Sequence, residues 1–169
     1  MMEWYARAPR GRNAMDELIL RRRSGSEEET EEIGCALAER LTAGDFLWLS
    51  GEMGAGKTAF VRGLCRFLCP GARVQSPTYT VMRDYPGRSC RVYHFDMYRI
   101  SSPEDLESVG FYDCDGIIAA EWCENTPFAL PDRYYLVRIE KGKSERERTV
   151  TVTLRDFTKE GAENVHPGS

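Results

Sequence analysis

Residues 51–58 read Gly-Glu-Met-Gly-Ala-Gly-Lys-Thr and fit the pattern G-x-x-x-x-G-K-[ST] without a gap. Glycines let backbone N–H groups turn inward toward oxyanions, where larger side chains would block them. Lys57 can reach the outer phosphates of a nucleotide, and the Thr58 hydroxyl can bind Mg²⁺. The stretch therefore predicts a phosphate-binding loop. The residues expected to contact the nucleotide are Gly51, Glu52, Met53, Gly54, Ala55, Gly56, Lys57 and Thr58.

Glu121 follows the apolar run Ile-Ile-Ala-Ala at residues 117–120. In open α/β sheets ligands bind beyond the carboxyl ends of the strands, and enzymes with a phosphate loop place a Mg²⁺-holding acid there. That acid is usually Asp, and Glu is longer by one methylene group. Glu121 is therefore a candidate metal ligand or water-orienting base, and the alternative is a strand-end acid in solvent.

Asp96 lies in the run His-Phe-Asp-Met-Tyr-Arg at residues 94–99, within an apolar strand pattern. A carboxylate in such surroundings needs a cation, a metal ion or a water molecule. Asp96 is either a metal-linked or water-activating acid or a structural partner of Arg99. His94 shares its strand face and is interpreted as a structural histidine, outside catalysis.

The candidate acids and the loop together indicate Mg²⁺-dependent hydrolysis of a nucleotide, because no acceptor pocket is evident. Thr78 follows Ser-Pro and could sense the γ-phosphate as a switch residue, or could simply form a turn. The sequence has no Asn-Lys-x-Asp or Thr-Lys-x-Asp motif for guanine, which favours ATP over GTP.

The elements around the loop occur in the order that it needs. Residues 26–44 predict a helix with Ser26 as N-cap, an acidic first turn and Gly44 at its end. Residues 45–49 form a short apolar strand, typical of a buried parallel sheet, that leads into the loop. Residues 57–69 predict the following helix, with Phe67 among its core-facing residues.

Two antiparallel hairpins are expected besides the parallel strands. Residues 79–85 and 90–98 are joined by Pro-Gly-Arg-Ser, and residues 134–140 and 145–154 by Lys-Gly-Lys-Ser. A helix beginning after N-cap Ser102 lies between the hairpins. The expected fold is α/β, a single three-layer sandwich of the P-loop NTPase type with a mixed sheet.

The chain has 169 residues, 41% apolar and 30% charged, with a net charge of −4. This suits one domain and excludes a general nucleic-acid binder, so a nucleic-acid role would be indirect or use a local patch. No apolar run has membrane-spanning length, and residues 1–12 lack the apolar core of a secretory signal. We therefore expect a cytoplasmic protein whose six cysteines are reduced, as surface or core thiols rather than zinc ligands.

The expected organisation is a basic extension at residues 1–23, an ATPase domain at 24–156 and a polar tail at 157–169. The extension is either flexible or an edge segment, with an arm that contacts RNA or a partner as the alternative. Residues 18–20 could form a short strand that carries the arginines along an edge.

The motifs at residues 51–58, 76–79 (Ser-Pro-Thr-Tyr), 94–99 and 121–122 (Glu-Trp) together resemble the TsaE (YjeE) family. The resemblance covers roughly residues 26–154, in order and with fitting spacing. It implies a small ATPase that works with the TsaD–TsaB pair, which a TsaC-type enzyme supplies with threonylcarbamoyl-adenylate. The product is N6-threonylcarbamoyladenosine at position 37 of tRNAs that read codons beginning with A. The fold implied is a P-loop α/β sandwich with a mixed sheet.

The resemblance also implies roles for single residues. Lys57 and Thr58 would bind phosphate and Mg²⁺, and Glu121 would hold Mg²⁺. Asp96 would be a catalytic acid or base, and Trp122 would lie near the nucleotide.

Two further nucleotide contacts follow from the family, one at the start of the first helix and one in the last hairpin. They map onto Ser26 and, less directly because the hairpin register is open, onto Arg146. For Ser26 the residue pattern alone favours helix capping. The resemblance says nothing about the chain before about residue 24.

Two other functions fit a phosphate loop. A small-molecule or nucleoside kinase would need an Arg-rich lid and a second substrate pocket. A nucleotide-gated binding module would hydrolyse ATP only incidentally. Turnover that rises with TsaD and TsaB would separate a regulated ATPase from both.

Overall fold

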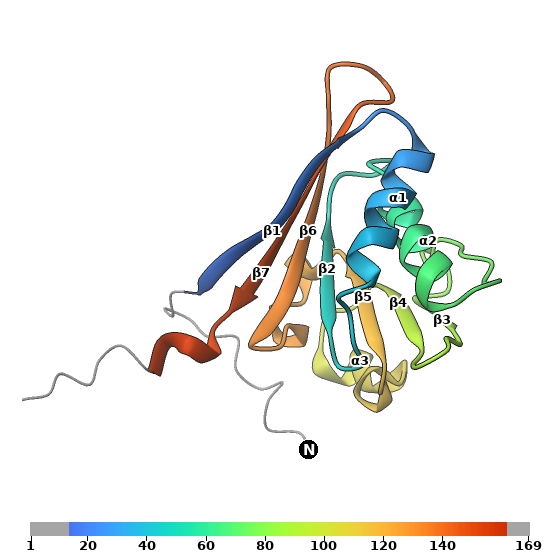
Figure 1. Ribbon diagram of the computed structural model, residues 1–169. Helices are drawn as coiled ribbons and strands as arrows, with labels where there is room; N and C mark the ends of the chain where they lie inside the picture. Colours follow the sequence, from blue (N-terminus) through green and yellow to red (C-terminus); the bar gives the residue numbers. More distant parts are fainter. Residues whose placement is uncertain (1–13, 162–169) are drawn as a thin grey trace, which may run out of the picture.

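The computed structural model describes residues 14–161, which form a mixed seven-stranded sheet with helices on both faces (Figure 1). In chain order the elements are β1 (Met15–Ser24), α1 (Glu27–Ala38), β2 (Phe46–Ser50), α2 (Lys57–Leu68), β3 (Met82–Tyr85), β4 (Val92–Asp96), α3 (Pro103–Ser108), η1 (Phe111–Asp113), β5 (Ile117–Glu121), η2 (Cys123–Asn125), η3 (Pro127–Ala129), β6 (Arg133–Lys141), β7 (Arg148–Asp156) and η4 (Thr158–Gly161). None of the helices in this part of the chain is long and apolar enough to cross a membrane.

The strand order is β1-β7-β6-β2-β5-β4-β3. Strands β6, β2, β5 and β4 are parallel neighbours at the centre, while β3–β4, β6–β7 and β1–β7 pair antiparallel. Both predicted hairpins and the α/β fold with a mixed sheet are confirmed. Because the central strands are parallel, their carboxyl ends meet at one edge, and that edge carries the site.

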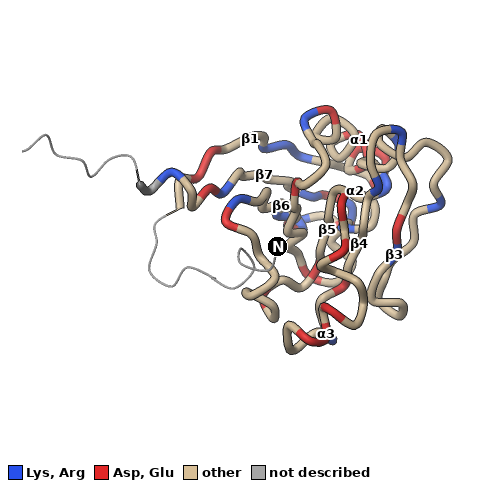
Figure 2. The backbone as a smooth tube through the Cα atoms, turned by 90° about the horizontal axis from the view of Figure 1, so that it is seen from below, with Lys and Arg blue, Asp and Glu red and all other residues tan. Residues whose placement is uncertain are grey.

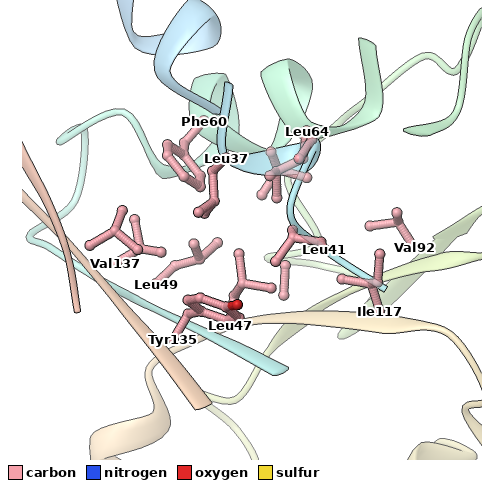
Figure 3. Close-up of a cluster of buried hydrophobic side chains, with 14 of the residues drawn as sticks. Leu37, Leu41, Leu47, Leu49, Phe60, Leu64, Val92, Ile117, Tyr135 and Val137 are labelled. Carbon is pink, nitrogen blue, oxygen red and sulfur yellow. The ribbon is translucent and has the colours of Figure 1, made fainter. Parts of the chain in front are cut away.

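Two apolar cores hold the layers together. On one face, α1 and α2 pack against the central strands through large, fully buried side chains (Figure 3); these include Leu37, Leu47, Leu49, Phe60 and Leu64. On the other face the covering layer is thin, consisting of the short α3 and 3₁₀ turns η1 to η3. There the Phe111 ring lies 5.3 Å from Phe95 and 6.4 Å from Phe46, between the turns and the sheet.

The helix starts follow their local sequence. Ser26 caps α1, its hydroxyl accepting from the Glu29 N–H at 3.2 Å, and the Glu29 carboxylate accepts from the Gly25 N–H at 2.6 Å. At α3, Ser102 and Asp105 form a complete capping box. The predicted starts are thus confirmed, because capping is decided by residues three positions apart.

Three local expectations differ from the structure. Helix α1 ends at Ala38 instead of Gly44, although Leu41 beyond it is still buried. Phe67, expected to face the core, is 45% exposed. The face of α2 that packs on the core includes Val61 and Cys65, and Phe67 lies outside it. The first hairpin strand begins only at Met82, after a turn.

Residues 15–24 form β1, a ten-residue edge strand paired antiparallel with β7. Of the alternatives for the basic extension, this part is the edge segment, and it extends well beyond residues 18–20. The sheet thus begins ahead of the boundary expected at residue 24. Residues 1–13 and 162–169, which include most of the expected tail, lie outside the described residues.

Helices α1 and α2 touch backbone to backbone. A Cβ on Gly63 would lie 2.0 Å from the Glu31 carbonyl oxygen, and one on Gly34 would lie 2.3 Å from that of Phe60. Real Cβ atoms do not approach this closely, so only glycine permits the packing that positions α2 and the loop before it.

We expect Gly63→Ala to lower the free energy of unfolding by about 1–3 kcal/mol, because the added methyl group forces the two helices apart. Urea denaturation followed by circular dichroism measures this. Gly25→Ala is the control, since its Cβ would meet only the Glu29 side chain at an ordinary 3.6 Å. Equal urea midpoints for Gly63→Ala and the wild type would contradict the close helix contact.

Candidate functional site

Two carboxylates end neighbouring parallel strands. Asp96 closes β4 and Glu121 closes β5, and the two residues are direct register partners. Both are 5% exposed. The sheet therefore brings together the two acids predicted separately from the sequence.

The phosphate loop connects β2 to α2 at the same edge. Its backbone enters the left-handed region at Gly54 (φ 76°) and Gly56 (φ 112°), where glycine has little steric penalty. A Cβ on Gly51 would lie 2.7 Å from the Ile139 carbonyl oxygen, so β6 presses directly against the loop. No side chain caps the N-terminus of α2, which leaves its first N–H groups available to an anion.

Lys57 is 7% exposed and lies within this loop. Its Nζ donates to the Gly51 carbonyl oxygen at 2.8 Å and lies 4.6 Å from the centre of the Trp122 ring. Trp122 has φ 63°, an uncommon value for a residue with a side chain, which turns the chain directly after Glu121. The structure thus brings Trp122 next to the candidate phosphate-binding lysine.

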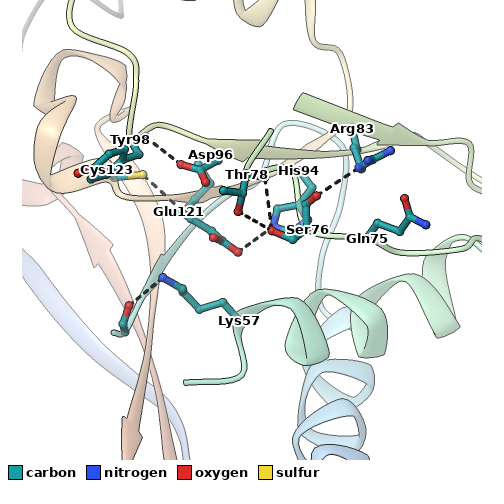
Figure 4. A network of polar contacts seen from close by, with 12 residues as sticks. Lys57, Gln75, Ser76, Thr78, Arg83, His94, Asp96, Tyr98, Glu121 and Cys123 are labelled. Carbon is teal, nitrogen blue, oxygen red and sulfur yellow. Dashed lines mark hydrogen bonds and ion pairs between the residues drawn. The ribbon is translucent and has the colours of Figure 1, made fainter. Parts of the chain in front are cut away.

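His94 contacts Glu121, a relation that sequence reasoning missed (Figure 4). His94 Nε2 lies 3.1 Å from Glu121 Oε1, and the imidazole is fully buried. Its Nδ1 has no hydrogen-bond partner within residues 14–161. An imidazole N–H at Nε2 can donate to this carboxylate oxygen, and that contact holds the orientation of Glu121. The available signal was the spacing of His94 two residues before Asp96, on the same strand face.

The hydrogen bonds around Asp96 bear on its interpretation as a structural partner of Arg99. Asp96 Oδ1 accepts from the Tyr98 N–H at 2.9 Å, and Arg99 donates to the Thr78 carbonyl oxygen. The structural pair with Arg99 is therefore wrong, because Arg99 tethers the loop that precedes β3. The Thr78 hydroxyl shares a 2.7 Å hydrogen bond with the Ser76 hydroxyl, a local contact typical of a turn. Thr78 also lines the cavity described next.

A cavity of about 710 Å³ opens between these groups. Its walls include side chains from the loop, β4, β5 and the start of α2; among them are Met53, Lys57, Thr58, Asp96, Glu121 and Trp122. Complete burial raises the pKa of the nearby Cys123 thiol well above its usual value, so this cysteine stays protonated. The cavity can accept phosphates beside two carboxylates and a lysine.

Thr58 and the two acids suit Mg²⁺. Within residues 14–161 no three His, Cys, Asp or Glu side chains form a metal-binding group, so the protein offers no complete cage. Mg²⁺ is typically held by one or two carboxylates, with waters and substrate phosphates completing the octahedron. The Thr58 hydroxyl, Glu121 and Asp96 at one cavity fit that donor set.

A second cavity, of about 460 Å³, lies on the other side of the loop, between the start of α1 and the β6–β7 hairpin. Ser26 and Arg146 both line it, so the structure brings these two candidates together. Arg148, which the sequence did not single out, donates through Nε to the Ala55 carbonyl at 2.9 Å and through Nη2 to that of Gly54 at 3.2 Å. The register of the β6–β7 hairpin therefore decides that Arg148, and not Arg146, donates to the loop carbonyls.

The remaining loop residues face outward. Met53 is 80% exposed at the mouth of the larger cavity. Glu52 lies 3.6 Å from Lys141 Nζ, which also donates to the Met53 carbonyl oxygen at 3.1 Å. These contacts attach the outer side of the loop to β6.

We expect His94→Leu to lower both stability and nucleotide turnover. The substitution leaves Glu121 buried without its donor, which costs about 1–3 kcal/mol of unfolding free energy. His94→Gln places an amide N–H near the position of Nε2 and should recover most of both quantities. Urea denaturation and phosphate release measure them, and equal losses in the two variants would contradict the positioning role.

The sequence profile described as Threonylcarbamoyl adenosine biosynthesis protein TsaE matches residues 24–150. Several proteins named tRNA threonylcarbamoyladenosine biosynthesis protein TsaE are similar in sequence. The Bacillus subtilis protein is 35% identical over 134 residues, covering 78% of this chain and 85% of its own. The Haemophilus influenzae protein is 38% identical over 97 residues, 56% of this chain and 61% of its own.

The Rickettsia conorii relative is 36% identical over 102 residues, covering 59% of this chain and 58% of its own, so the match spans about three fifths of that protein. Among solved structures, the crystal structure of Bacillus subtilis YdiB superposes with a TM-score of 0.65 at 27% identity. It covers 86% of this chain and 88% of that one. The matched profile includes the phosphate loop, both carboxylates and the tryptophan beside them, and the chain belongs to the TsaE family.

Proposed function

We propose that this chain is a Mg²⁺-dependent ATPase that supports formation of N6-threonylcarbamoyladenosine in tRNA. The observation that carries the proposal is the meeting of Lys57, Asp96 and Glu121 at one cavity beside the phosphate loop. Hydrolysis of a phosphoanhydride needs positive charge on the phosphates and an oriented water, and these residues can supply both.

Each residue has a role that its contacts support. Lys57 exchanges its bond to the Gly51 carbonyl for one to the outer phosphates, while the loop N–H groups bind the remaining oxygens. Glu121, fixed by His94, and Asp96, held by the Tyr98 N–H, are the two groups able to orient water or ligate metal. Bound Mg²⁺ would supply further charge neutralisation, with Thr58 and Glu121 as its protein ligands.

The smaller cavity is our candidate for the nucleoside end of ATP. Ser26 and Arg146 line it on the side of the loop away from the carboxylates. ATP is favoured over GTP because the sequence has no guanine-reading motif. Trp122 would lie against the phosphate region, near Lys57.

The role in tRNA modification is carried over from the names of the relatives and from the family profile. We propose that the chain acts in the cytoplasm with TsaD and TsaB, and that it reaches tRNA through that complex. The same proposal includes the site of the modification, which is adenosine 37 of tRNAs that read codons beginning with A.

The test is tRNA modification reconstituted from purified TsaC-type enzyme, TsaD, TsaB, ATP and tRNA, with and without this chain. We expect the modified nucleoside, measured by mass spectrometry, only when the chain is present. ATP turnover by the chain should be slow alone and rise with TsaD and TsaB. Phosphoryl transfer to a metabolite well above the rate of hydrolysis would overturn the proposal in favour of a kinase.

A further inference from the structure

Strands β1, β7 and β6 extend beyond the layer formed by α3 and the 3₁₀ turns (Figure 1). Val150 and Val152 of β7 point toward α1, since they are buried in the core on that side. The alternating residues Thr149, Thr151 and Thr153 therefore point to the opposite face, where they are partly exposed.

Strand pairing places arginines on the same face as these threonines. Arg21 and Arg23 of β1 lie opposite Thr151 and Thr149, and Arg138 of β6 lies opposite Thr151 from the other side. All three arginines are exposed. We call this surface the arginine face; its members are Arg21, Arg23, Arg138, Thr149, Thr151 and Thr153.

The arginines of this face are unpaired within residues 14–161, since none of them makes an ion pair or a side-chain hydrogen bond there. By contrast, Arg155 further along the same face is neutralised by Asp16 at 3.1 Å. Glu140, opposite Thr149, is an acidic residue on the face. Figure 2 shows Lys and Arg gathered along β1, β6 and β7 at the end of these strands near α1.

We propose that the arginine face binds RNA through its phosphate backbone. Arg21 and Arg23 are two residues apart on one strand face, which separates their Cα atoms by about 6.6 Å. Arg138 lies two strands away, at a distance between the strand backbones of about 9.6 Å. Guanidinium groups bind phosphate oxygens in a bidentate way, and threonine hydroxyls are common additional phosphate partners. An array of this kind can contact successive phosphates of an RNA strand.

The residue types favour RNA over a protein partner. Protein interfaces depend on apolar and aromatic anchors at their centre. Most of the large exposed apolar residues belong to other elements, namely Met53, Phe67, Tyr79 and Tyr98. In β1, Leu18 lies at one end of the face opposite Thr153, and Met15 pairs with Asp156 beyond that end. None of the residues that define the arginine face has an aromatic ring to stack on bases, so binding should be independent of sequence and sensitive to salt.

This contact goes beyond the proposed function, in which tRNA is reached through partner proteins. It also agrees with a net charge of −4, because a local patch is sufficient for an acidic chain. Arg138 is adjacent to Ile139, whose carbonyl meets Gly51 of the phosphate loop. RNA on this face would thus contact β6, the strand that packs against the phosphate loop. Binding of RNA itself requires no ATP hydrolysis.

The test is fluorescence anisotropy of a labelled tRNA transcript with the full chain, from 50 to 200 mM salt. The variant Arg21→Gln/Arg23→Gln/Arg138→Gln should weaken binding at least 10-fold and reduce the slope of log K against log salt by about 2. The matched control is Arg40→Gln/Arg66→Gln/Arg88→Gln, which removes three exposed charges from other surfaces and should change binding less than 3-fold.

Three results would overturn the proposal: wild-type chain that does not bind tRNA at 50 mM salt, equal weakening in the two triple variants, or binding of polyglutamate in preference to RNA. The last would indicate an acidic protein partner instead. Lys57→Ala should bind tRNA as the wild type does, so failure of the ATPase proposal and failure of the RNA proposal are distinguishable. ATP-analogue binding by the triple variant confirms that the sheet is folded.

Discussion

Lys57→Ala should reduce ATP turnover by about 10²–10³-fold and weaken ATP binding. The lysine is nearly buried, and its Nζ is held at the mouth of the phosphate loop by the Gly51 carbonyl and the Trp122 ring. Removing it deletes the ammonium group beside the phosphate loop, and the other cations that line the larger cavity within residues 14–161 are the guanidinium groups of Arg62 and Arg99. Phosphate release and titration with a fluorescent ATP analogue measure the two effects.

The control for this experiment is Lys159→Ala, which removes an exposed lysine near the far end of β7. It should leave both turnover and nucleotide affinity unchanged. The lysine would have no part in phosphate binding if Lys57→Ala bound and hydrolysed ATP like this control. Reconstituted tRNA modification should fail with Lys57→Ala and proceed with Lys159→Ala.

Glu121→Ala should retain ATP binding but lose turnover by about 10²–10³-fold. Its carboxylate lies at the carboxyl end of β5, is oriented by His94, and is the register partner of Asp96. Turnover that survives in this variant would make Asp96 the essential acid, and Asp96→Asn would then show the larger loss. The measurements are analogue titration, phosphate release, and the dependence of turnover on Mg²⁺ concentration.

Two variants separate charge from structure at this position. Glu121→Gln keeps an oxygen that can accept from His94, so it should fold like the wild type and still hydrolyse ATP poorly. Glu121→Ala leaves His94 Nε2 buried without an acceptor, which should lower the unfolding free energy by about 1–3 kcal/mol. Glu124→Ala, an exposed acid three residues further on, should leave stability and turnover unchanged.

The parts of the fold that the sequence predicted are those decided by near neighbours. The cap at Ser26 depends on Glu29, and the loop of residues 51–58 depends on its own glycines and on the helix that follows. Both hairpins were predicted, because turn residues between alternating segments leave little freedom of pairing. Glu121 was likewise evident as an acid ending a buried strand.

The sequence by itself therefore determined the phosphate loop, the hairpins and the candidate acids, since each is encoded within a few consecutive residues. Only the tertiary structure decided which distant side chains meet. Strand register places His94 against Glu121 and Arg148 on the loop carbonyls, and it places Arg21 and Arg138 on one face. A shift of one residue in any of these pairings would send each side chain to the opposite face of the sheet, and the register is set by packing across the whole sheet.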